Sequence, residues 1–408
     1  MELNKKVIGG SIILLITFNL FNLLNFLFQF SMARLLTLIE YGVLATLFSL
    51  VYVLGIFSES IQTIVAKYSS NERNIGKIKN LLKKTVRKSL VVSVYLLIVY
   101  LIAAIPLSSI LNIEYSLFFI TGFIIFASFL APIPRGILQG RKKFGTLGMN
   151  LVLEGATKII FGVIIVVVFS SLGFFYMRTH GAVFSAVFAS LLAMAVAFLT
   201  LKEVLKSKEE EIKTDGIYIY ARPAFVINLV IFVFFSLDII FAKIFFNPET
   251  AGAYAIASIL AKTVFLGVQP ISKAMFPLSS EKSKDKKEAE KILGNAMIII
   301  SALLVIALLI FFFFPDLIVY IFSGKIIPLS SSVLFWISLA FAIMAITNLV
   351  LFYKLSIGQT KGYQYLFIFI VLQVSLLSYF SSNPLAFVFA LIVSSAAFLW
   401  GALFLIRD

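Results

Sequence analysis

The sequence predicts an all-α integral membrane protein, with about twelve transmembrane helices in two six-helix bundles related by a pseudo-two-fold axis along the membrane normal. Three observations support this class. Hydrophobic residues make up 61% of the 408 residues and charged residues only 13%, whereas a soluble domain has about 25% charged residues. Hydrophobic runs of about 18 or more residues recur along the whole chain. Basic residues gather in every second connection between these runs.

The hydrophobic runs are long enough to cross a bilayer, and the short connections place successive helices side by side. The first run is too long for a secretory signal peptide, and no cleavage-site pattern follows it. The predicted spans lie near residues 7–30, 41–64, 89–111, 117–138, 147–170, 180–201, 223–246, 251–272, 294–314, 329–353, 363–380 and 385–406.

The distribution of basic residues predicts the orientation. With both termini in the cytoplasm, the inward loops and tails hold 28 Lys and Arg, and the outward loops hold only Arg34, Arg178 and Lys325. This agrees with the positive-inside rule in every loop, so we expect a multi-pass protein of the plasma membrane. The inward basic loops would face anionic membrane lipids, which also accounts for the net charge of +15.

Residues 75–88 place apolar side chains at helical spacing among lysines, which predicts an amphipathic helix in the membrane interface. A nucleic-acid partner is not expected, because no segment is long enough to form a soluble binding domain.

The chain divides into two similar halves, each with six spans and a long inward loop after its second span. We expect an N-terminal bundle at 1–201, a cytoplasmic linker at 202–222 and a C-terminal bundle at 223–408. Both halves begin in the cytoplasm, so the repeats are parallel and a substrate site is expected between them.

A stripe of amides marks the first predicted helix. Asn19, Asn22, Asn25 and Gln29 fall on one side of it, and the stripe ends at Arg34. The amides either bind neighbouring helices or line a substrate cavity, since amides facing lipid would lose their hydrogen bonds. The density of amides favours the cavity.

The fifth predicted span carries Asn150, Glu154 and Lys158 on one helix face. Glu154 lies four residues before Lys158, the favourable order for an intrahelical ion pair. The group is either a self-neutralised pair between helices or part of a substrate or ion site, and the sequence leaves both open.

The second half has its own buried polar residues. Asn228 and Asp238 lie on the seventh predicted span and Lys262 on the eighth. Asp238 and Lys262 lie at similar depths, so they are able to pair across neighbouring helices. Alternatively, Asp238 or Glu154 takes up a proton or a sodium ion that drives transport. The substrate-cavity residues that we predict are Asn19, Asn22, Asn25, Gln29, Arg34, Asn150, Glu154, Lys158, Asn228 and Lys262.

Other polar and helix-breaking residues receive simpler interpretations. Pro132, Pro134 and Pro270 should bend or end their helices. Arg135 is best explained as an anchor at the inner face, and His180 as a solvated residue of an outward loop.

No catalytic motif is present, so the chain is not expected to be an enzyme. It has no Cys and a single His, which excludes disulfides, thiol chemistry and the usual zinc sites. We expect no metal and no cofactor beyond a coupling H+ or Na+.

Several segments resemble the polysaccharide transporter branch of the multidrug/oligosaccharidyl-lipid/polysaccharide (MOP) exporter superfamily, which includes the Wzx-type flippases. The similarity covers the whole chain through short, degenerate motifs: ARLLTLIEYGVLATLFSLVYVLG (33–55), ILQGRKKFG (137–145), LDIIFAKIFFNPETAGAYAIA (237–257), PDLIVYIFSGK (315–325) and KLSIGQTKGY (354–363).

This resemblance implies alternating access and transport of a polyprenyl-linked oligosaccharide, with its diphosphate headgroup, from the inner to the outer leaflet. A glycosyltransferase or polymerase of the same pathway would be a partner, and we expect a monomer. The alternatives are a cation-coupled multidrug exporter of the same superfamily and, less favoured, an integral-membrane glycosyltransferase, which needs a larger outer loop or an acidic metal site. The sugar, the lipid carrier, the coupling ion and the oligomeric state stay open.

Overall fold

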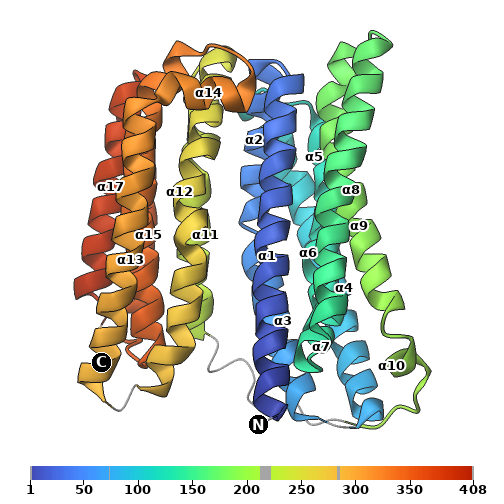
Figure 1. Ribbon diagram of the computed structural model, residues 1–408. Helices are drawn as coiled ribbons and strands as arrows, with labels where there is room; N and C mark the ends of the chain where they lie inside the picture. Colours follow the sequence, from blue (N-terminus) through green and yellow to red (C-terminus); the bar gives the residue numbers. More distant parts are fainter. Residues whose placement is uncertain (1, 73, 212–221, 283–284, 407–408) are drawn as a thin grey trace. The chain divides into compact units, whose positions relative to one another are not determined.

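The computed structural model describes residues 2–72, 74–211, 222–282 and 285–406, which form helices joined by short turns (Figure 1). The chain divides into two compact units, one of residues 1–36 and 50–219 and the other of residues 37–49 and 220–408. Residues 212–221 of the predicted linker 202–222 lie outside the described residues, and so does the tail residue Arg407.

The first unit is a bundle in which α1 packs on α8, α8 on α9, and α3 on α7. Its amino-terminal end, α7 and α10 lie at the same end of this bundle (Figure 1). The helices of this unit are α1 (Glu2–Leu35), α3 (Gly55–Asn71), α4 (Ile75–Leu111), α5 (Tyr115–Gly122), α6 (Ile124–Leu130), α7 (Pro132–Gly140), α8 (Phe144–Ser171), η1 (Phe175–Met177), α9 (Arg178–Leu199) and α10 (Lys202–Lys206).

The second unit is built around α12 and α15, with α17 packed on α15. Residues 37–49, which include most of α2 (Leu38–Tyr52), belong to this unit, where Gly42 lies directly against the backbone of Gly252 on α12. The sequence order does not indicate this grouping. The other helices are α11 (Arg222–Phe245), α12 (Pro248–Glu281), α13 (Lys286–Phe313), α14 (Pro315–Ser323), α15 (Pro328–Ser356), η2 (Tyr363–Leu366), α16 (Phe367–Tyr379) and α17 (Pro384–Phe404).

In the described part of the chain, eleven helices are long and apolar enough to cross a membrane. This confirms a multi-pass membrane protein. A twelfth apolar segment, Tyr363–Tyr379, takes the place of the span predicted at 363–380 but is shorter than the others. It is short because its first four residues form a 3-10 turn, which leaves 13 residues for α16.

The prolines of the fourth predicted span act as expected. In place of one helix at 117–138, the chain forms α5, α6 and α7, with junctions at Phe123 and at Ala131, and only the second lies beside a proline, Pro132. Pro270 does not end its helix, since α12 continues through that residue, and a bend there stays a prediction. The span predicted at 41–64 is likewise divided, into α2 and α3.

Two helices of the second unit begin with the same capping pattern. The Asn247 side chain accepts a hydrogen bond of 2.8 Å from the Thr250 backbone N–H, and Asn383 accepts one of 2.8 Å from Ala386. A proline follows each asparagine at the first helical position, where its missing N–H costs nothing.

The amino-terminal part of α4 corrects one prediction. Residues 75–88 do not form a separate interfacial helix, because α4 runs without a break from Ile75 to Leu111. The apolar face of this part packs on protein, with Ile78, Leu81 and Leu82 at most 4% exposed. They belong to a core cluster with residues of α3, α7, α8 and α10, which are Val65, Ile133, Ile137, Leu138, Leu147, Leu201 and Val204.

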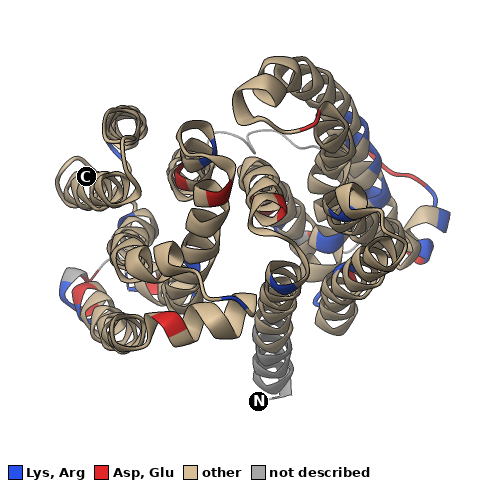
Figure 2. Ribbon diagram, turned by 90° about the horizontal axis from the view of Figure 1, so that it is seen from above, with Lys and Arg blue, Asp and Glu red and all other residues tan. Residues whose placement is uncertain are grey.

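Few charged residues lie inside the bundles. Viewed along the helices, most of the ribbon is uncharged, and acidic positions are few (Figure 2). The charged side chains that are less than 9% exposed among the described residues include Arg135, Asp238, Lys243 and Lys262. A charge placed there needs a partner or a function.

Candidate functional site: the ionic networks inside the bundles

The main network of the first unit is built on one face of α8. Asn150 and Glu154 lie one turn apart, and Lys158 follows one turn later, as the sequence predicts. The Asn150 amide is 3% exposed and donates a hydrogen bond of 2.8 Å to the Ala193 carbonyl oxygen of α9. This bond fixes the network between α8 and α9.

Arg135 enters the same network from α7. Its Nε donates to the Asn150 Oδ1 at 2.8 Å, and its Nη2 lies 2.5 Å from the Glu154 Oε2. The second Glu154 oxygen accepts a hydrogen bond of 3.1 Å from the Ser190 hydroxyl. Arg135 is 8% exposed, so the prediction of an inner-face anchor is wrong. The structure pairs Glu154 with Arg135, a partner that the predicted Glu154–Lys158 pairing did not include.

Lys158 points toward α1. Its Nζ donates to the Asn25 Oδ1 at 3.1 Å and lies 4.5 Å from the centre of the Phe28 ring. A cation over an aromatic ring is stabilised by about 0.5–2 kcal/mol. Asn25 therefore connects the amide stripe of α1 to the network on α8.

Glycines bring α1 and α8 close enough for this contact. Gly148, Gly155 and Gly162 recur every seven residues on the side of α8 that faces α1. A Cβ atom at Gly155 would lie 2.8 Å from the Leu24 Cβ, so only glycine allows the observed approach. This repeat is visible in the sequence and would have predicted the α1–α8 contact.

The network carries a net positive charge. Arg135 and Lys158 are cationic and Glu154 is the carboxylate between them, which gives +1 for the three ionisable side chains. Arg135 and Glu154 are mostly buried, with side chains 10% and 17% exposed. Basic side chains inside a membrane bundle are able to bind an anionic group.

The other residues of the α1 stripe lie in more open positions. Asn19 and Asn22 are exposed and Gln29 is half-buried. Arg34 is exposed, with its guanidinium 4.6 Å from the centre of the Phe30 ring. Their predicted role in lining a cavity stays a prediction.

The second unit holds a separate ion pair. The Lys262 Nζ donates to the Asp238 Oδ1 at 2.9 Å, which confirms that the two residues meet between α11 and α12. Asp238 also accepts a hydrogen bond from the Ser258 hydroxyl, and it is fully buried. Lys262 lies between the Phe235 and Phe341 rings, 4.8 and 5.4 Å from their centres. This pair is neutral and enclosed, which favours a structural role.

Asn228 and His180 are two further polar residues, one in each unit, and they differ in burial and in hydrogen-bond partners. Asn228 is half-buried and donates a hydrogen bond of 2.9 Å to the Ala224 carbonyl oxygen within its own helix. His180 is 8% exposed in the first turn of α9, with Nε2 2.9 Å from the Ser116 hydroxyl and 3.4 Å from Glu114. The prediction of a solvated His180 is therefore wrong.

The fold of this chain is similar to the folds of several solved membrane transporters. The chain is similar to an inward-facing multidrug resistance MATE family transporter of the MOP superfamily, at 16% identity over 94% of each chain with a TM-score of 0.71. It is also similar to the lipid II flippase MurJ in an inward closed conformation, at 14% identity over 96% of this chain and 87% of that one, with a TM-score of 0.73. A third similar structure is the eukaryotic MATE transporter AtDTX14, at 14% identity over 99% and 96% of the two chains, with a TM-score of 0.70.

Residues 8–283 match the family described as polysaccharide biosynthesis protein. The match covers more than half of the chain, and the chain belongs to this family. None of the curated proteins matches it. The family and the solved structures agree with the resemblance noted in the sequence.

Proposed function

We propose that this protein is a flippase that moves a polyprenyl-linked oligosaccharide, by its diphosphate headgroup, from the inner to the outer leaflet through alternating access. The observation that carries this proposal is the network of two basic side chains and one carboxylate, Arg135, Lys158 and Glu154, inside a membrane bundle. A diphosphate is an anion that such a network attracts, and membership of the polysaccharide biosynthesis family supports a sugar-linked lipid.

The alternative is a cation-coupled exporter of amphipathic drugs. A site for lipophilic cations needs an unbalanced carboxylate, whereas the Glu154 carboxylate already has the Arg135 guanidinium and the Ser190 hydroxyl as partners. Asp238 is likewise balanced by Lys262. The charge balance of both units therefore favours an anionic substrate over a cationic one.

Each group of polar residues then has a distinct role. Lys158 attracts the diphosphate, and Arg135 holds Glu154 so that its carboxylate does not repel the substrate. The exposed amides of Asn19 and Asn22 offer donors and acceptors for sugar hydroxyls. A coupling proton or sodium ion at Asp238 or Glu154 stays a prediction, and the cationic partner of each carboxylate favours the structural role instead.

Binding of short-chain probes to the purified full-length protein tests this proposal. Geranylgeranyl diphosphate should bind at least about tenfold more tightly than neutral geranylgeraniol, and also more tightly than tetraphenylphosphonium. Added salt should weaken the binding of geranylgeranyl diphosphate but not that of neutral geranylgeraniol, as far as solvent reaches the site. Tighter binding of tetraphenylphosphonium than of the diphosphate would favour the drug exporter.

We further propose a plasma-membrane location with both termini in the cytoplasm, based on the 28 inward and three outward basic residues. The chain has no native cysteine, so single cysteines report cleanly on accessibility. In intact cells, Ile326→Cys, at a residue 80% exposed beside α14, should react with an impermeant maleimide. Lys208→Cys, at an exposed residue after α10, should stay unlabelled until the cells are opened, and labelling from outside would refute the orientation.

A further inference from the structure

The end of α4 that precedes its membrane-spanning part carries an exposed basic face. Lys83, Lys84, Arg87 and Lys88 are all exposed. Within about one turn the same side of the helix becomes apolar, and Val91 and Tyr95 are 65% and 66% exposed. Exposed apolar residues on a membrane-spanning helix face lipid chains, so the basic face lies at the level of lipid headgroups.

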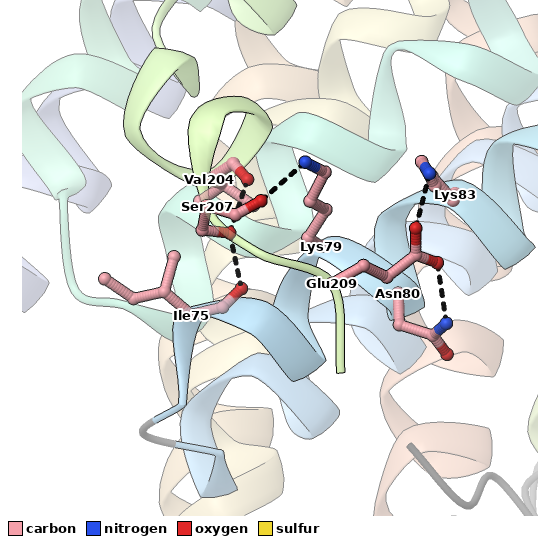
Figure 3. A network of polar contacts seen from close by, with 7 residues as sticks. All are labelled: Ile75, Lys79, Asn80, Lys83, Val204, Ser207 and Glu209. Carbon is pink, nitrogen blue, oxygen red and sulfur yellow. Dashed lines mark hydrogen bonds and ion pairs between the residues drawn. The ribbon is translucent and has the colours of Figure 1, made fainter. Parts of the chain in front are cut away.

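An acidic segment, residues 207–211, lies against the amino-terminal end of α4, just before and at the start of this face (Figure 3). Lys79 donates a hydrogen bond of 2.6 Å to the Ser207 carbonyl oxygen, and Asn80 donates one of 2.8 Å to the Glu209 carboxylate. Lys83 forms an ion pair with the same carboxylate. The Lys83 and Asn80 hydrogen bonds hold the pKa of Glu209 below its usual range.

The segment is also joined to α4 through backbone groups. The Glu210 N–H donates to the Gly76 carbonyl oxygen at 3.2 Å, and the Asn74 amide donates to the Glu210 carboxylate at 2.7 Å. A Cβ atom at Gly76 would clash with the Lys208 carbonyl oxygen, so this close approach requires glycine. The acidic segment is thus docked on α4 in a defined position.

Within the described residues, the carboxylates of the acidic segment form ion pairs only with the basic residues nearer the amino-terminal end of α4. Glu209 pairs with Lys83, and Glu211 lies 4.0 Å from Lys84. Among the residues that the structure describes, neither Arg87 nor Lys88 has a carboxylate within ion-pair distance. These two cations lie nearest to the lipid-facing surface.

We propose that Lys84, Arg87 and Lys88 bind the headgroup of an anionic phospholipid, and that Glu209 and Glu211 compete with this lipid for the basic face. The acidic segment shows that the face accepts anionic oxygen atoms, because Glu209 is held by a lysine and an amide together. A lipid phosphate supplies the same oxygen atoms, and the apolar surface around Val91 accepts its chains.

Brominated lipids measure this binding directly. A bimane fluorophore on Val91→Cys in the full chain is reconstituted with brominated phosphatidylglycerol or brominated phosphatidylcholine. The anionic lipid should quench the fluorophore at a lower mole fraction than the zwitterionic lipid. Each basic residue that contacts the headgroup should lower this mole fraction by about fivefold. The Lys84→Gln/Arg87→Gln/Lys88→Gln variant should bring the two lipids close to equality. The Glu209→Gln/Glu211→Gln variant should widen the difference.

Ile110→Cys, at a residue 51% exposed near the other end of the same helix, is the matched control and should show no lipid preference. Inorganic phosphate should compete no better than sodium chloride of equal ionic strength, because lipid chains contribute to binding. Equal quenching by the two lipids at Val91→Cys would overturn the lipid site. If the Glu209→Gln/Glu211→Gln change leaves the preference for the anionic lipid unaltered, the proposed competition between these carboxylates and the lipid is overturned.

Discussion

The Arg135→Gln variant is expected to fold poorly, because it leaves the Glu154 carboxylate without the guanidinium 2.5 Å away. Removing one partner of a buried ion pair costs about 3–5 kcal/mol. The two side chains are 10% and 17% exposed, so water compensates for only part of this loss. The folded yield and the free energy of unfolding in bicelles measure the effect.

A second substitution separates folding from transport. Arg135→Gln/Glu154→Gln should recover most of the stability and keep measurable transport, because the charge of Lys158 is retained. Lys158→Gln should fold, since Lys158 contacts the Asn25 amide and the Phe28 ring, yet lose transport. A stable but inactive Arg135→Gln/Glu154→Gln variant would contradict the positioning role of Arg135.

The exposed pair of Lys143 and Glu203 is the matched control for these experiments. Its charged atoms lie 3.6 Å apart, and its side chains are 45% and 79% exposed. Lys143→Gln should therefore change the free energy of unfolding by no more than about 1 kcal/mol.

The second large effect is expected at the Asp238–Lys262 pair. Lys262→Gln should prevent accumulation of folded protein, because Asp238 is fully buried and would keep a charge without its 2.9 Å partner. The expected loss is about 3–5 kcal/mol. Asp238→Asn/Lys262→Gln should fold again and transport normally, since the pair is neutral and enclosed.

Ser236→Ala on the same helix is the control, because this buried hydroxyl donates only within α11, to the Phe232 carbonyl oxygen at 2.9 Å. Its effect should stay near 1 kcal/mol. A well-folded double variant that has lost transport would show that Lys262 or Asp238 acts on the substrate or the coupling ion instead.

Hydropathy and charge distribution were sufficient to predict the class of fold, because lipid imposes long apolar helices on any chain that crosses it. They did not predict how helices are divided. The 3-10 turn before α16 and the continuity of α4 were not predicted, and the packing of residues 37–49 with the second unit depends on contacts between distant segments. The division at Ala131 was predictable from Pro132 and Pro134, which lack a backbone N–H for the helix.

The sequence predicted the site residues on α8, but it did not predict the site residue that comes from α7. Asn150, Glu154 and Lys158 share a helix face because of their spacing alone. Arg135 was missed because it reaches this face from another helix, and its place directly after two prolines was the available signal. The Asp238–Lys262 contact followed from their matching depths in adjacent spans.

The central claim is that the protein carries an anionic, lipid-linked sugar across the membrane. Proteoliposomes with the full-length protein and a fluorescent polyprenyl-diphosphate disaccharide in the inner leaflet test it most directly, through the fraction of fluorophore that external dithionite bleaches. We predict that the wild-type protein raises the rate of bleaching well above that of protein-free liposomes, and that Lys158→Gln returns it to that level. A wild-type protein that leaves this lipid in place while moving a lipophilic cationic dye would contradict the account.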